Sequence, residues 1–161
     1  IKVHSIRPAT VCGLSDRMRL DVAVNLLTFQ ALKNGKITVL GGNQTRPNIH
    51  IDDMVNVYLH FLKNCDAIES GEYNAGFENI SIMDIANAVK SVIDCDIEVL
   101  PSNDPRSYRQ NSDKLLKTGF VQNFKVMDAI LEIKNAYEDG FLTDEDNWYT
   151  VRKMKKILAI V

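Results

Sequence analysis

Segments with the alternating pattern of a β-strand and segments with the periodicity of an amphipathic helix follow one another along this chain of 161 residues. The sequence predicts strands over residues 1–10, 36–40, 73–77 and 96–100. Apolar residues at helical spacing predict helices over 20–34, 54–62, 82–93 and 126–137, with further helices after Ser112 and from about Tyr149. Strands that alternate with helices are typical of the α/β class, which we expect here.

Polar residues and glycines mark where several of these helices begin and end. Asp53 stands in the N-cap position of helix 54–62, and Ser112 in that of the short helix that follows it. Ser81 followed by Asp84 resembles a capping box, with Asp in place of Glu. Gly35 ends the first helix, and a second glycine, Gly140, stands in the C′ position of helix 126–137. These signals place the helix boundaries to within a few residues.

The predicted sheet is short of strands. Four strands are fewer than the roughly five or six that a sheet of this class usually contains, and the helices outnumber them. The sequence also begins with Ile1 inside a strand-like pattern and ends on an apolar run over residues 157–161. We therefore expect this chain to be a piece of a longer protein.

Composition and charge exclude several classes of protein. Hydrophobic residues make up 45% and charged residues 25% of the sequence, which is an ordinary globular mixture. The net charge of −2 offers no basic field, so we expect no nucleic-acid partner. No apolar run approaches the ~20 residues that span a bilayer, so we expect no membrane partner. Three widely spaced cysteines without CxxC spacing, Cys12, Cys65 and Cys95, indicate reduced thiols and a cytoplasmic location.

Arginines gather in the predicted loops. Five of the seven arginines lie in three loops, and they are Arg17, Arg19, Arg46, Arg106 and Arg109. A guanidinium group presents a planar fork of donors that suits phosphate oxygens, so arginines that converge from separate loops would clamp a diphosphate. The alternative is a set of surface ion pairs with nearby Asp residues, each worth about 0–1 kcal/mol. The spacing alone leaves both interpretations open.

Two other features are weaker candidates for a metal-binding or catalytic site. His50, Asp52 and Asp53 could be a metal or acid–base group, but Asp53 is expected to cap a helix and adjacent carboxylates point in different directions. We therefore expect no metal site. Cys12 could be a nucleophile, yet no base lies close in sequence, and a buried small residue is the interpretation we prefer.

Four ordered motifs resemble those of one protein family. Residues 7–13 read RPATVCG and resemble R-P-x-x-V-Y-G, with Cys12 where Tyr is common. Residues 41–53, GGNQTRPNIHIDD, resemble G-x-x-x-x-R-x-x-I-H-V-x-D, and residues 73–76 resemble a Y-N-x-G strand. Residues 104–120 resemble a D-x-R … S-x-K … L-G-F/W block. Together they are similar to the extended short-chain dehydrogenases/reductases, the NAD-dependent sugar-nucleotide epimerases and dehydratases such as UDP-glucose 4-epimerase.

This resemblance implies a fold and a division of the chain. Residues 1–13 and about 71–77 would be late strands of a Rossmann-type parallel sheet. Residues of about 14–70 and 78–161 would form mostly the smaller α/β substrate-binding lobe and the C-terminal helices. The family's Gly-rich loop and its catalytic Tyr-x-x-x-Lys pair lie N-terminal to the R-P-x-x-V-Y-G segment. The resemblance therefore implies that the N-terminal Rossmann half is absent from this chain, and we expect no catalytic residue in it.

The resemblance also assigns binding roles by position. The nicotinamide end of NAD, with NADP as the alternative, would pass residues Pro8, Ala9, Thr10 and Val11. The nucleotide-diphosphate sugar would contact the helix entry, the middle strand and the loop arginines, namely Arg17, Arg19, Asp21, Val22, Asn25, Thr38, Leu40, Arg46 and Arg106. Thr38 and Leu40 would flank the base, and Arg46 and Arg106 would hold the diphosphate. Asn48 stands where relatives often have a larger residue.

These implications favour one function and leave two others open. The parent protein would be a homodimeric nucleotide-sugar epimerase or dehydratase that acts by transient hydride transfer to NAD, and this chain alone would be inactive. The first alternative is a non-catalytic module of the same superfamily that binds a dinucleotide or a partner. The second is a reductase of a non-nucleotide substrate, in which replacing Arg46 or Arg106 would barely change substrate affinity.

Overall fold

The computed structural model describes residues 1–159, and the last two residues of the expected apolar run, Ile160 and Val161, lie outside the described part. The helices are α1 (Ala23–Asn34), α2 (Ile51–Asn64), α3 (Ile82–Lys90), α4 (Asp113–Leu116), α5 (Val126–Glu138), the short 3-10 helix η1 (Asp146–Trp148) and α6 (Thr150–Leu158). The strands are β1 (His4–Pro8), β2 (Thr10–Cys12), β3 (Lys36–Leu40), β4 (Thr45–His50), β5 (Gly71–Ala75), β6 (Glu78–Ser81) and β7 (Asp96–Leu100). This mixture of alternating strands and helices confirms the α/β class.

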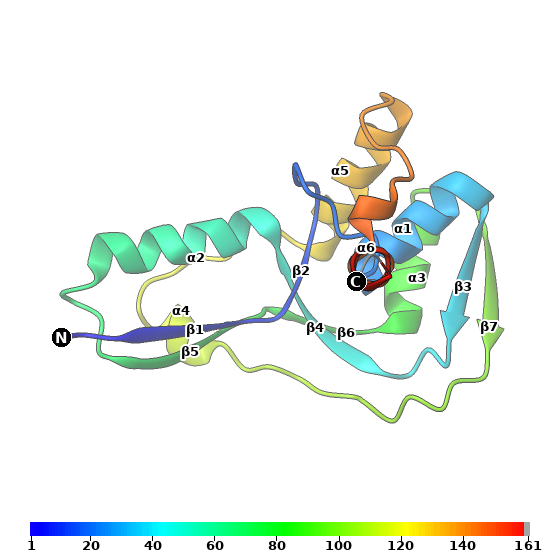
Figure 1. The fold of residues 1–161 in the computed structure, drawn as a ribbon. Helices are drawn as coiled ribbons and strands as arrows, with labels where there is room; N and C mark the ends of the chain where they lie inside the picture. The colour runs from blue at the N-terminus through cyan, green and yellow to red at the C-terminus, as the bar shows by residue number, and fades with distance from the viewer. Residues whose placement is uncertain (160–161) are drawn as a thin grey trace.

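The strands form three small sheets (Figure 1). Strand β1 pairs in parallel with β5, with His4 opposite Gly71. Strand β4 lies between β2, which is parallel to it, and β6, which is antiparallel. Strand β3 pairs in parallel with β7, with Lys36 opposite Asp96. The two parallel pairs β1–β5 and β3–β7 lie at opposite ends of the molecule, and the β2–β4–β6 sheet lies between them.

Apolar side chains gather in separate clusters. Helices α1, α3 and α5 pack together with strand β3 around Val24, Ile85 and Ile130, which are buried. Helix α2 packs its Val57 and Phe61 with Tyr73 of β5, so this helix covers one face of the β1–β5 pair. The outer face of α2 exposes an apolar stripe of four residues, Val55, Tyr58, Leu59 and Leu62. Over the described residues, no helix is both long enough and apolar enough to cross a bilayer.

Three strands were not predicted from the sequence, and one of them, β2, separates at Ala9 from the strand predicted over residues 1–10 and joins another sheet. Strand β4 reads TRPNIH and β6 reads ENIS, so neither shows the apolar alternation on which strand prediction depends. Pro47 has no N–H to donate. It is tolerated in β4 because β2 pairs only with residues 48–50, so no donor is needed from residue 47 on that side. The Asn48 side chain stays among backbone groups, where its amide donates to the carbonyls of Arg46 and Glu78. Polar strands of this kind can be recognised only when the strands with which they pair are known.

Of two predicted helix caps, Asp53 is wrong, and Ser112 stands in the N-cap position of α4 without a side-chain cap bond. Helix α2 begins at Ile51, and its cap is His50, whose ring Nδ1 accepts the backbone N–H of Asp52 at 3.2 Å. Asp53 is instead fully buried and binds the loop before α5. Ser112 makes no cap bond, because its hydroxyl is held by both the N–H and the carbonyl of Gly76, at 3.0 and 2.7 Å.

Other local signals are confirmed. Gly35 ends α1 in the left-handed conformation, with a φ of 61°, and its N–H donates to the carbonyl of Ala31. Ser81 caps α3 by accepting the N–H of Asp84 at 3.0 Å, and the carboxylate of Asp84 accepts the Ser81 hydroxyl. These caps are correct because each depends on residues only a few positions apart.

Candidate functional site

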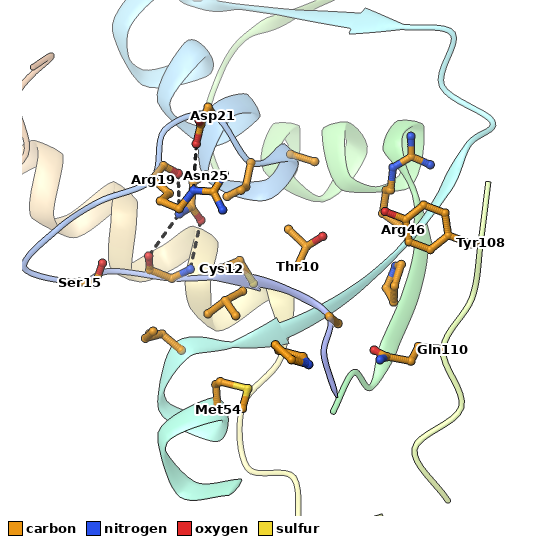
Figure 2. A pocket seen from close by; sticks show the side chains of 18 of the residues that line it. Thr10, Cys12, Ser15, Arg19, Asp21, Asn25, Arg46, Met54, Tyr108 and Gln110 are labelled. Atoms are coloured by element: carbon orange, nitrogen blue, oxygen red, sulfur yellow. Dashed lines mark hydrogen bonds and ion pairs between the residues drawn. The ribbon is translucent and has the colours of Figure 1, made fainter. Parts of the chain in front are cut away.

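An open pocket of about 1080 Å³ lies beside the ends of strands β1 and β2 (Figure 2). One wall is the loop from Gly13 to Val22 with the first turn of α1. The opposite wall is β4 together with residues 101–112, which we call the strap. The ends of β1 and β2, from Pro8 to Cys12, lie between these walls.

Buried hydrogen bonds hold the first wall in place. The side chain of Asn25 on α1 is almost fully buried. Its Oδ1 accepts the N–H of Gly13 at 3.1 Å, and its Nδ2 donates to the carbonyl of Arg19 at 3.1 Å. Asn25 therefore fixes the shape of the loop with most of its hydrogen-bonding capacity.

Asp21 joins this wall to helix α6. Its Oδ1 lies 3.1 Å from Nε of Arg19, and its Oδ2 accepts the N–H of Thr150 at 2.9 Å. Burial favours the neutral acid, but the hydrogen bond and charge of Arg19, with the bond from Thr150, outweigh it and hold the pKa of Asp21 below its usual value. Asp21 is therefore ionised at neutral pH and pairs with Arg19.

Arg46 anchors the second wall. Its guanidinium group is mostly buried, with Nη2 3.3 Å from Oδ2 of Asp104. Nη1 donates to the carbonyls of Thr45 and Arg106, and the guanidinium carbon lies 5.2 Å from the ring centre of Tyr108. Arg46 thus ties strand β4 to the strap with most of its donors.

Asp104 brings a second arginine to the same place. Nε and Nη2 of Arg106 each lie 2.7 Å from a carboxylate oxygen of Asp104, which is a bidentate ion pair. These hydrogen bonds hold the pKa of Asp104 far below its usual value, so the carboxylate is ionised. Because Asp104 contacts both Arg46 and Arg106, it holds the two guanidinium groups together at one end of the pocket.

Hydrogen bonds to strands β6 and β1 fasten the strap. Oδ1 of Asn79 accepts the N–H of Gln110 at 2.8 Å, and Nδ2 of Asn79 donates to the carbonyl of Gln110 at 3.0 Å. Nε2 of Gln110 donates to the carbonyl of Arg7 at 2.8 Å. The strap is therefore a fixed wall, although it contains no regular secondary structure.

The pocket collects most of the residues that the sequence singled out. Those that line it are Pro8, Ala9, Thr10, Val11, Arg17, Arg19, Asp21, Val22, Asn25, Arg46 and Arg106. Thr38 and Leu40 do not line it. They lie on the outward face of β3 at the far end of the molecule, and the Leu40 side chain is exposed.

Several lining residues were not assigned from the sequence. They include Ser15, Met54, Asn74, Tyr108 and Gln110, and Arg109, which was noted as a loop arginine, also lines the pocket. An aromatic residue between two loop arginines was the available signal for Tyr108. No local signal existed for Met54, because α2 buries this side chain in its apolar face.

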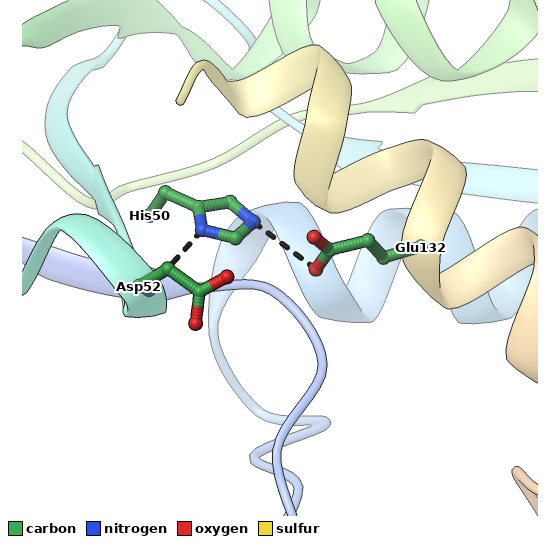
Figure 3. Close-up of side chains that lie close together, drawn as sticks. All are labelled: His50, Asp52 and Glu132. Atoms are coloured by element: carbon green, nitrogen blue, oxygen red, sulfur yellow. Dashed lines mark hydrogen bonds and ion pairs between the residues drawn. The ribbon is translucent and has the colours of Figure 1, made fainter. Parts of the chain in front are cut away.

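A cluster of His50, Asp52 and Glu132 is the group of side chains closest to a metal-binding arrangement in residues 1–159 (Figure 3). Nε2 of His50 lies 3.1 Å from Oε2 of Glu132 on α5, and Nδ1 accepts the N–H of Asp52. A neutral ring that accepts at Nδ1 carries its proton on Nε2, so neither nitrogen offers a free lone pair. The ring also stacks on Phe124, with centres 4.7 Å apart. The cluster joins β4 to α5 through hydrogen bonds.

The spacing Tyr-x-x-x-Lys occurs at Tyr149 and Lys153, but neither residue lines the pocket. Nζ of Lys153 donates to Oδ1 of Asn147 at 2.8 Å. Burial and the hydrogen bond to Asp144 raise the pKa of Tyr149 to about 12. A tyrosine that removes a proton near neutral pH needs a lower pKa, so this pair does not have the properties of a catalytic base.

Comparison with protein families gives one match. Residues 1–76 match the model of the NAD dependent epimerase/dehydratase family. The matched segment holds β1, β2, the first wall of the pocket, Arg46 and strand β5.

Solved structures with the same fold include three epimerases. UDP-glucuronic acid 4-epimerase from Bacillus cereus, solved with UDP-glucuronic acid and NAD, is 23% identical with a TM-score of 0.67, over 83% of this chain and 44% of that chain. UDP-N-acetylglucosamine 4-epimerase from the same organism is 17% identical with a TM-score of 0.70, over 85% and 48%. UDP-glucose 4-epimerase from Thermus thermophilus, solved with NAD, is 18% identical with a TM-score of 0.68, over 86% and 47%. The chain thus spans about half the length of each.

Proposed function

Because residues 1–76 match the NAD-dependent epimerase/dehydratase family, we propose that this chain is the nucleotide-sugar-binding part of an NAD-dependent nucleotide-sugar epimerase or dehydratase. In this proposal β1 and β5, with α2 packed on them, are the Rossmann-type part of the chain. The remaining elements form mostly the substrate-binding lobe. The parent protein acts on the sugar, and the present chain binds and orients it.

One observation carries the proposal, which is that Arg46 and Arg106 converge on one carboxylate at one end of the pocket. Arg46 comes from β4 and Arg106 from the strap, so two distant segments supply the pair. Guanidinium groups bind phosphate oxygens through parallel hydrogen bonds. A diphosphate that lies against this pair would neutralise charge that Asp104 alone leaves uncompensated.

The ends of β1 and β2 fit the nicotinamide end of a dinucleotide. Dinucleotides bind beyond the carboxyl ends of parallel strands, and Pro8, Ala9 and Thr10 lie at or beyond the end of the paired part of β1 and β5. Gly76 follows β5, and a Cβ atom there would lie only 2.5 Å from Cβ of Ala9. The two backbone segments at Ala9 and Gly76 therefore lie close together where the cofactor would pass. NAD, when bound, accepts a hydride from a sugar carbon and returns it.

The chain's own residues then have defined tasks. Arg46 and Arg106 bind the diphosphate, while Pro8 to Val11 form the floor against which the sugar and the nicotinamide meet. The pair of Tyr149 and Lys153 lies outside the pocket, and the pKa of Tyr149 is raised. We therefore propose that this chain alone does not turn over substrate, and that the parent protein supplies the base.

Titration calorimetry of the chain with UDP-glucose tests the binding role. Arg106→Ala removes a mostly exposed side chain and should leave the fold intact, as circular dichroism would verify. We expect it to weaken binding about 10-fold or more, since a hydrogen bond to a charged group is worth about 1.5–3 kcal/mol. Arg46→Ala should have an effect in the same direction, and Arg152→Ala on α6, outside the pocket, should have none. Unchanged affinity in Arg106→Ala would show that Arg106 does not hold the diphosphate of UDP-glucose. That result would favour the alternative of a substrate without a diphosphate.

A further inference from the structure

Helix α6 (red in Figure 1) differs from the other α-helices of residues 1–159 because it buries none of its residues. All residues from Val151 to Leu158 are exposed. Isolated helices shorter than about 12–15 residues are marginal in water, and in proteins the packing of an apolar side supplies the missing stability. A helix of nine residues therefore needs a surface that covers it.

The apolar side chains of α6 lie on one side of the helix. At about 100° per residue, they fall within a sector of about 120°, which we call the apolar face of α6. Its members are Val151, Met154, Ile157 and Leu158, and each of these residues is more than half exposed. Within the described part of the chain, nothing buries this face.

The opposite side of α6 is basic and attaches the helix to the chain. Arg152 and Lys156, which are one turn apart, both form ion pairs with Asp146 of η1. The guanidinium carbon of Arg152 also lies 3.7 Å from the ring centre of Tyr149. Because these contacts hold the basic side against η1, the apolar face points away from η1.

A lysine stands at each border of the apolar face. Helical periodicity places Lys153 at one border and Lys155 at the other. Among residues 1–159 neither lysine forms an ion pair, and Lys153 donates only to the neutral side chain of Asn147. Since α6 contains no acidic residue, two uncompensated positive charges flank its apolar face.

The apolar stripe on α2 has different borders. Asp52 and Lys63 lie at the same border of that stripe, where their opposite charges offset each other, and the buried Met54 lies at the other. The stripe on α2 therefore shows no preference for a charged partner. The borders of α6 do show one, because they call for a surface that is apolar in the middle and negative on both sides.

We propose that α6 binds along the surface of a lipid bilayer that contains anionic lipids. The apolar face then enters the boundary between head groups and acyl chains, and Lys153 and Lys155 extend along it to the lipid phosphates. The expectation of no membrane partner rests on the length of a segment that spans the bilayer. A helix that lies along the surface does not need that length.

A second copy of the chain fits this face less well. Two α6 helices packed through their apolar faces would bring lysines together at every border, and like charges repel. The face also lies outside the pocket, since no residue of α6 lines it. This inference is therefore independent of the proposed function.

Sedimentation of the chain with lipid vesicles at low salt tests the inference. We expect binding to vesicles of phosphatidylcholine and phosphatidylglycerol to be about 10-fold tighter than to phosphatidylcholine alone. Met154→Glu places a carboxylate in the apolar face and should weaken the binding about 10-fold. The double variant Lys153→Gln/Lys155→Gln should lose most of the preference for phosphatidylglycerol, because each lysine near an anionic surface adds to the attraction.

Matched controls keep the type of change and move it away from α6. Leu62→Glu makes the same kind of substitution at an exposed position of the α2 stripe. The double variant Lys90→Gln/Lys117→Gln removes two exposed lysines and changes the net charge by the same amount as the α6 variant. Both controls should bind the vesicles as the unchanged chain does. Circular dichroism verifies that each variant is folded.

Each other outcome would overturn the inference. The chain would then fail to sediment with phosphatidylglycerol vesicles, or it would bind both kinds of vesicle equally. Equal losses in the α6 variants and in their controls would show a general attraction that does not involve this helix. A dimer that forms without vesicles and is abolished by Met154→Glu would assign the apolar face to a second copy of the chain.

Discussion

The buried carboxylate of Asp53 lies 2.9 Å from the backbone nitrogen of Phe124 and accepts its hydrogen. Asp53 also accepts the N–H of Asn123, at 3.1 and 3.2 Å from its two oxygens. Helix α2 and the loop before α5 are thus joined through a side chain that is fully buried. Since α5 packs against α1, this contact also supports the first wall of the pocket.

Replacing Asp53 should therefore destabilise the chain. In Asp53→Asn one oxygen becomes an N–H₂ group that faces backbone donors, so a buried N–H loses its partner. We expect a loss of about 1–3 kcal/mol in the free energy of unfolding, measured by urea denaturation. Asp52→Asn is the matched control, because Asp52 is exposed and makes no side-chain bond to this loop. Equal stability of the two variants would contradict this role of Asp53.

Asn79 should control the opening of the strap. Its side chain makes two hydrogen bonds to the backbone of Gln110, and Asn79→Ala removes both. At about 1 kcal/mol for each bond, the strap should open at least 10-fold more often. Trypsin cleavage after Arg106 and Arg109, followed by mass spectrometry, measures this opening. Asn135→Ala on the exposed face of α5 should leave the cleavage rate as it is in the unchanged chain.

Tyr149 should matter for stability and not for binding. Its hydroxyl pairs with Asp144, which also binds Lys33. Tyr149→Phe removes this pairing and should lower the free energy of unfolding by about 1 kcal/mol. The affinity for UDP-glucose should not change, because Tyr149 lies outside the pocket. A loss of affinity with unchanged stability would give Tyr149 a place in the binding site.

The cysteines should differ sharply in reactivity. Burial, with the nearby charge of Glu78, raises the pKa of the Cys12 thiol to about 12, while Cys65 is exposed. The thiolate is the reactive form, so Ellman's reagent at pH 8 should modify Cys65 quickly and Cys12 only after unfolding. Cys65→Ser should abolish the fast phase. Cys95 is buried as well, so rapid labelling that persists in that variant would contradict the burial of Cys12 or Cys95.

The same shift predicts a dependence of stability on pH. The folded-state pKa of Cys12 is raised above the unfolded value of about 9. Its contribution to stability is therefore complete below that value and is lost as the pH rises toward about 12. Urea midpoints should fall over this range, and they should fall less in Cys12→Ala than in the unchanged chain.

Much of the fold could be predicted because its signals are local. The helix end at Gly35 and the cap at Ser81 depend on residues within one or two turns. Strand β7 matched its predicted range because its β-branched residues lie between clear boundaries. The cap at Asp53 was wrong for a related reason. A carboxylate near a helix start can serve either the helix or a distant loop, and the sequence does not reveal the loop.

The candidate site was predictable in part. The loop arginines pointed to an anion, but their pairing with Asp104 and Asp21 depends on how distant segments meet. The same holds for the strap, whose position rests on Asn79 and on Gly76, both far from it in sequence. Strand β3 shows the opposite case. The alternation over 36–40 located the strand, yet nothing in it revealed that Thr38 and Leu40 would face away from the pocket.

The pairing of β1 with β5 has a consequence for how the chain folds. His4 pairs with Gly71, and the first pocket wall, β3, β4 and α2 all lie between these two residues in the sequence. The β3–β7 pair likewise brings together Lys36 and Asp96. Such distant contacts require large loops to close before any strand hydrogen bond forms, which gives a high contact order and slow folding. During synthesis on the ribosome, β1 must therefore wait for β5 to emerge before the floor of the pocket can take shape.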